Sequence, residues 1–75
     1  MKVRLHAVGT LGNEYHEVAT LQEGYSVVDN LVKALQAKNY KINWCSRANG
    51  LISSATMAHV KTGQCVSVDI ITKES

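Results

Sequence analysis

The sequence predicts a single α+β domain over residues 1–75, with its elements in the order ββαβββ. Two observations predict this class. One segment has the apolar spacing of an amphipathic helix, and five others have features typical of strands. The chain of 75 residues has room for one domain only. A domain this small buries only about 60% of the surface that its unfolded chain exposes, so each core position matters.

The first strand is predicted from Lys2 to Val8, because apolar and polar residues alternate there. A turn follows at residues 9–13, and a return strand at residues 14–21. The facing of this second strand has two readings. One buries Tyr15, Ala19 and Leu21 and also turns Glu17 inward, whereas the other buries Val18. We favour the first reading, although a β-bulge would reconcile the two.

The helix is predicted from Ser26 to Asn39. The hydroxyl of Ser26 can cap the first turn, and Asn39 is a suitable left-handed stop. Asp29 and Lys33 are four residues apart and are expected to pair on the solvent side. The apolar positions follow the i, i+3, i+4, i+7 rule and share one face: Val28, Leu31, Val32 and Leu35.

A second hairpin is predicted from Lys41 to Ala58, because Asn49-Gly50 favours a two-residue turn. The expected cross-strand pairs are Ala48–Leu51, Ser46–Ser53, Trp44–Ala55 and Ile42–Met57. The face opposite Trp44 is expected to carry Lys41, Asn43, Cys45, Arg47, Ser54 and Thr56, with Ile52 as its apolar exception. A competing reading makes residues 53–60 a short helix.

The last strand is predicted from Gln64 to Thr72, after a turn at Thr62-Gly63, and residues 73–75 form a polar tail. The helix is expected to cover one face of the sheet, leaving the other face to solvent. The predicted core is aliphatic apart from one Trp, and it comprises Val3, Leu5, Leu21, Val28, Leu31, Val32, Leu35, Ile42, Trp44, Val66, Val68 and Ile70.

The passage from the second strand into the helix carries Glu23-Gly24, Ser26-Val27 and the run 28–31 (Val-Asp-Asn-Leu). Together with the element order, it resembles the β-grasp fold of ubiquitin and the small sulfur-carrier proteins. The resemblance implies a mixed sheet in which the first and last strands lie parallel at the centre. The C-terminal Gly-Gly of that family is missing, because the chain ends at residues 72–75 with Thr-Lys-Glu-Ser. Conjugation and sulfur carriage are therefore not expected.

Net charge, apolar runs and cysteine content limit the partners and the cellular location to be expected. The formal net charge of +2 is too small to indicate a nucleic-acid or membrane partner by itself. No apolar run reaches the ~20 residues of a membrane helix, and residues 1–11 lack the apolar core of a signal peptide, so a cytoplasmic location is expected. Cys45 and Cys65 are expected to be free thiols, because two cysteines are too few for a disulfide scaffold.

No catalytic or metal-binding constellation is expected. The histidines and cysteines lack ligand spacing, and nothing marks Cys45 as a nucleophile beside a base. Gly9 and Gly12 do not join a strand to a helix, so they do not predict phosphate binding. We therefore expect no enzyme activity and no cofactor.

Binding functions remain. The leading prediction is a small protein-interaction or regulatory module that binds a partner protein, and a homodimer is compatible with it. The alternative is nucleic-acid binding through a basic sheet face. The candidate binding face is this basic face, and it comprises Lys2, Arg4, His6, Lys41 and Arg47. A protein partner could also add a strand to an edge of the sheet.

Overall fold

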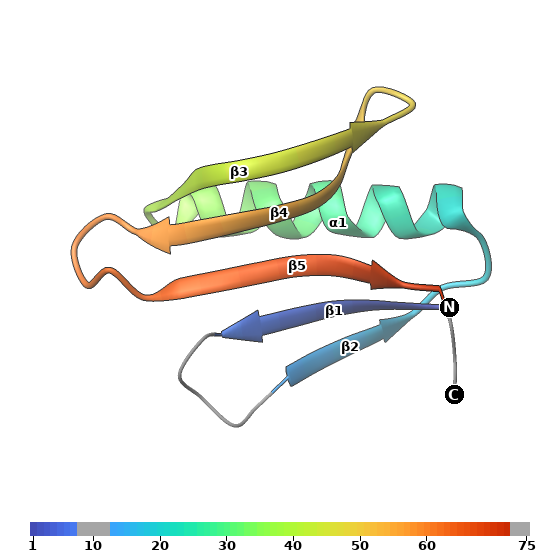
Figure 1. The fold of residues 1–75 in the computed structure, drawn as a ribbon, viewed down its shortest axis with the longest axis horizontal. Coiled ribbons are helices and arrows are strands. Elements are labelled where there is room, and N and C mark those ends of the chain that lie inside the picture. Colours follow the sequence, from blue (N-terminus) through green and yellow to red (C-terminus); the bar gives the residue numbers. More distant parts are fainter. Residues whose placement is uncertain (8–12, 73–75) are drawn as a thin grey trace.

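The structure is a computed structural model and describes residues 1–7 and 13–72. Val8, most of the predicted turn at 9–13 and the tail at 73–75 lie outside the described residues. Along the chain, one helix follows the second of five strands and precedes the third (Figure 1). The elements are β1 (Lys2–Ala7), β2 (Asn13–Glu17), α1 (Leu21–Ala37), β3 (Tyr40–Ala48), β4 (Leu51–His59) and β5 (Cys65–Ile71).

The five strands form one antiparallel sheet in the order β2-β1-β5-β4-β3. The β-grasp-like mixed sheet is therefore a wrong prediction, because β1 and β5 are neighbours but run in opposite directions. Each connection from β1 through β2, α1, β3 and β4 to β5 reverses the chain (Figure 1). Five reversals leave β5 antiparallel to β1, whereas a parallel pair needs a connection that crosses back over the sheet.

The helix begins at Leu21, five residues before the predicted start. Thr20 is the N-cap, and its hydroxyl accepts the backbone N–H of Glu23 at 3.1 Å. A Thr followed three residues later by Glu is a capping-box pattern, and it overrides the weaker start at Ser26. Ser26 lies inside the helix. At the other end, Asn39 has a φ of 71°, which confirms it as the left-handed stop.

The core lies between α1 and the sheet, which α1 contacts through β1, β3, β4 and β5. Its fully buried larger side chains are Met57, Val3, Val28, Val32 and Val68. Leu5, Leu31, Leu35, Ile42 and Ile70 pack partly buried around them, and Val66 is buried. Two predicted core residues are wrong, since Leu21 is 42% and Trp44 58% exposed.

Val18 is the buried residue of the 14–21 segment, and the favoured facing of that segment is therefore wrong. β2 ends at Glu17, and the chain then turns under the sheet, where the N–H of Val18 donates to the carbonyl of Met1 at 3.1 Å. Tyr15 instead is 52% exposed. Residues 51–59 form strand β4, so the competing helix over 53–60 is also wrong.

The hairpin of β3 and β4 has the predicted pairs at both ends, Ala48–Leu51 and Ile42–Met57, but its middle is shifted by one residue. Asn43 is an extra residue in β3, and Ser53 is an extra residue in β4. These two bulges cancel each other. Between them, Trp44 pairs with Thr56 and Cys45 with Ala55, so the predicted pairs Trp44–Ala55 and Ser46–Ser53 are wrong.

Candidate functional site

The sheet face opposite α1 is called the open face here, because no described element covers it (Figure 1). On β1, β2 and β5 it carries polar and charged side chains, several of which contact one another: Lys2, Arg4, His6, Asn13, Tyr15, Glu17 and Asp69. On β4 and the neighbouring part of β5, its side chains are small: Ser54, Thr56, Ala58 and Ser67. Trp44 stands on the edge strand β3.

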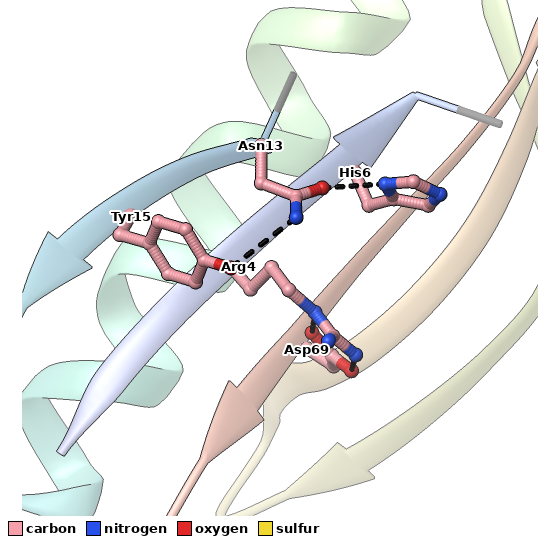
Figure 2. A network of polar contacts seen from close by, with 5 residues as sticks. All are labelled: Arg4, His6, Asn13, Tyr15 and Asp69. Atoms are coloured by element: carbon pink, nitrogen blue, oxygen red, sulfur yellow. Dashed lines mark hydrogen bonds and ion pairs between the residues drawn. The ribbon is translucent and has the colours of Figure 1, made fainter. Parts of the chain in front are cut away.

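Arg4 and Asp69 form the strongest polar contact on the open face (Figure 2). They are direct cross-strand partners on β1 and β5. The Nε of Arg4 donates to Oδ1 of Asp69 at 3.1 Å, and Nη2 donates to Oδ2 at 2.7 Å. These hydrogen bonds and the carboxylate charge raise the pKa of Arg4 above its usual value. The guanidinium is therefore held in a two-pronged ion pair within the chain.

A second contact network joins β1 to β2 (Figure 2). Nδ1 of His6 and Oδ1 of Asn13 lie 2.5 Å apart, and Nδ2 of Asn13 donates to the hydroxyl of Tyr15 at 3.2 Å. The Nζ atom of Lys2 lies 5.8 Å from the centre of the Tyr15 ring and 3.8 Å from Oε1 of Glu17. The two cations of β1 thus each have an acidic neighbour on an adjacent strand.

The structure brings together only part of the predicted basic face. Lys2, Arg4 and His6 share the open face, and Lys41 joins it at the far edge, where it pairs with Ala58. Arg47 does not belong to this face. It pairs with the buried Ile52 on the helix side, where its charge helps to lower the pKa of Asp29. The extra residue Asn43 in β3 causes this difference, because it reverses the facing of the β3 residues that follow it, so Arg47 does not share a face with Lys41.

Trp44 is the feature of the open face that the sequence reasoning missed. The bulge at Asn43 turns its indole away from the core and onto the open face. The sequence did contain a signal for this register. The unbulged register places the apolar residues Ile52 and Cys45 on the polar face, and the two bulges move both to the helix side. An apolar residue on a polar face of a predicted hairpin therefore indicates a bulge.

The remaining chemistry-bearing residues do not form a site. Cys45 faces the core, whereas Cys65 pairs with Ala58 on the open face, and both are free thiols. Within residues 1–7 and 13–72, no three His, Cys, Asp or Glu side chains are placed to hold a metal ion. Asp29 is buried, but Lys33 at 2.9 Å and the backbone N–H of Ile52 at 3.4 Å account for its carboxylate.

A pocket of about 420 Å³ opens on the helix side, between the C-terminal half of α1 and the first hairpin. Most of its lining is apolar, and its lining residues are Leu5, Ala7, Asn13, Glu14, Leu35, Tyr40 and Val66. Ala7 and Asn13 flank residues 8–12, which are outside the described part of the chain. The open face therefore gives the better-defined candidate site.

Comparisons with known proteins add no assignment. No protein-family model matches this chain, and searches of curated proteins and of solved structures likewise find no match. The resemblance to ubiquitin-like proteins stays a prediction from the sequence, without the mixed sheet that it implied. No helix among the described residues is long and apolar enough to cross a membrane. Function is therefore argued from the geometry of the open face.

Proposed function

We propose that this chain is a small non-enzymatic interaction protein of the cytoplasm, which acts by binding a partner protein over the open face. The observation that carries the proposal is the position of Trp44. Trp44 is 58% exposed on the open face, beside the small residues of β4. A Trp that is left exposed in this way is a typical anchor of protein interfaces, where Trp, Tyr and Arg supply most of the binding energy.

The charges of the open face support a protein partner over a nucleic acid. Binding of phosphates requires cations that are free to contact them. Arg4 is already held by Asp69 through two hydrogen bonds, Lys2 lies near Glu17, and Arg47 belongs to the other side of the sheet. Lys41 lies apart from them on the edge strand β3. A phosphate would have to displace Asp69 from Arg4. A protein surface could instead pack over the existing ion pair without breaking it.

Site-specific photocrosslinking in lysate from the native host tests this proposal. A photoreactive residue replaces Thr56, which is exposed on the open face beside Trp44. The matched control places it at Gln36, which is exposed on α1. We expect position 56 to form a protein adduct that resists nuclease, that is absent from position 36, and that is lost with Trp44→Ser. Crosslinking to nucleic acid from position 56, or no specific adduct at all, would overturn the proposal.

A further inference from the structure

The open face has the size and the charge balance of a self-association surface. The molecule extends over 35 × 29 × 16 Å, and the rectangle of its two longer extents, about 1,000 Å², is an upper limit on the area of the open face. A standard protein interface buries about 800 Å² per partner. One open face could therefore supply a stable interface of ordinary size, provided that most of the face takes part.

We propose that the partner on the open face is a second copy of this chain, which forms a two-fold symmetric dimer with the two sheets face to face. The inference rests on the proposed function and names its partner. The resulting order of layers is helix, sheet, sheet, helix. Each sheet would then be covered by α1 on one face and by the sheet of the other copy on its open face, as in the face-to-face packing of two sheets.

The charges permit this contact. In a two-fold interface, the same patch meets itself, so an unpaired charge near the axis meets a like charge. The central cation of the open face, Arg4, is neutralised within its own chain by Asp69, its neighbour on β5. Lys2 has Glu17 beside it. The remaining lysine of the face, Lys41, lies on the edge strand β3, apart from these pairs. A face whose central charges are internally paired can bind its own copy, whereas an unpaired basic face would repel it.

The shape also permits it. The large indole of Trp44 stands on the edge strand β3, and the neighbouring strand positions hold the small side chains of Thr56 and Ser67 in the same cross-strand row. Across a two-fold axis, the indole of one copy can pack on the low surface formed by the small residues of the other. The self-complementary pairing of one protruding aromatic and one low surface is the arrangement that buried interface anchors require.

Oligomeric state tests the proposal directly. The wild-type chain has a mass of 8.2 kDa, so light scattering after size exclusion should give about twice that value at high concentration. Trp44 is the only Trp of the chain, and its fluorescence should shift to shorter wavelength as the concentration rises. We expect Thr56→Arg and Trp44→Ser to weaken dimerisation at least tenfold, about 1.4 kcal/mol, while circular dichroism shows an unchanged fold.

Two further variants sharpen the result. Asp69→Asn leaves Arg4 unpaired and should also weaken the dimer, with recovery at high salt because unpaired like charges are screened. Leu21→Arg is the matched control, since Leu21 is exposed at the start of α1, away from the open face, and should leave the dimer intact.

A monomer at all concentrations would overturn the inference, and so would a dimer that persists unchanged in Thr56→Arg. The first of these results, combined with a Trp44-dependent adduct to a different protein in lysate, would leave the proposed function standing. If the chain is monomeric and also forms no crosslinked adduct from position 56, both the proposed function and the proposed dimer are wrong.

Discussion

Asp29 on the helix accepts the backbone N–H of Ile52 through Oδ1 at 3.4 Å, and so ties α1 to β4. The other carboxylate oxygen accepts from the ammonium of Lys33 at 2.9 Å. The i,i+4 pair was predicted, but it does not lie on the solvent side, because Asp29 is buried under the end of the second hairpin. The contact is located where Ser53 bulges out of β4, and it holds Ile52 at the core.

Acid should weaken this contact. The hydrogen bond from Lys33 and then that from Ile52 hold the pKa of Asp29 below its usual value. Ionised Asp29 therefore stabilises the folded state above about pH 4, and this stabilisation is lost as the pH falls through the lowered folded-state pKa. We expect Asp29→Asn to be less stable than the wild type in urea at pH 7, and the difference to shrink at acidic pH. Lys33→Met should act in the same direction, and Lys38→Met serves as the control. A difference that grows in acid would contradict the assignment.

The two bulges of the second hairpin should compensate each other. Deletion of Asn43 alone, or of Ser53 alone, shifts one strand by a residue and turns core side chains outward. We expect each deletion to lower the free energy of unfolding by more than about 2 kcal/mol, the scale of exposing one buried aliphatic side chain. Deleting both leaves every observed pair intact and restores strict alternation, so most of the stability should return. Urea unfolding measures this, and a double deletion less stable than either single one would refute the register.

The same hairpin shows what could be predicted from the sequence. Asn49-Gly50 correctly located the turn, and both residues have positive φ. The alternation of β1 and β5 placed Val3, Val66 and Val68 in the core. The apolar Ile52 and Cys45 on a polar face indicate a shift of register but do not locate the two bulges, because the shift is compensated ten residues later and the ends of the hairpin still match the unbulged register. The exposure of Trp44 and the separation of Arg47 from Arg4 follow from those bulges alone.

The order and direction of the strands in the sheet could not be predicted from local hydrophobic periodicity. Periodicity identifies the strands and the residues on each face, but it does not determine whether two neighbouring strands run parallel or antiparallel. The mixed sheet came from the resemblance in the 23–31 stretch, which carries information about a helix start rather than about β5. The helix also starts five residues before Ser26, because the hydroxyl of Thr20 accepts the backbone N–H of Glu23 and caps an earlier first turn.

The turn between β4 and β5 should depend on one imidazole nitrogen. Nδ1 of His59 accepts the backbone N–H groups of Lys61 at 3.2 Å and Thr62 at 3.3 Å, and its ring contacts Tyr40 edge-on. His59→Phe keeps a ring but removes the acceptor, whereas His59→Asn keeps a side-chain acceptor typical of such turns. Amide exchange at residues 61 and 62 should accelerate in the Phe variant and stay slow in the Asn variant. Equal exchange in His59→Phe and the wild type would exclude this role.

The ion pair between Arg4 and Asp69 should stabilise the fold more than the neighbouring pair between Lys2 and Glu17 does. Arg4 and Asp69 form two short hydrogen bonds, but their side chains are 38% and 36% exposed, so solvent screens much of the attraction. A double-mutant cycle with Arg4→Met and Asp69→Asn should give a coupling of about 0.5–1 kcal/mol that decreases with salt. Lys2 and Glu17, at 3.8 Å with Glu17 72% exposed, are the matched control and should give a smaller coupling. The cycles belong at low protein concentration, where dimerisation would not contribute. A larger coupling for Lys2 and Glu17 would contradict the two-pronged geometry as the source of the difference.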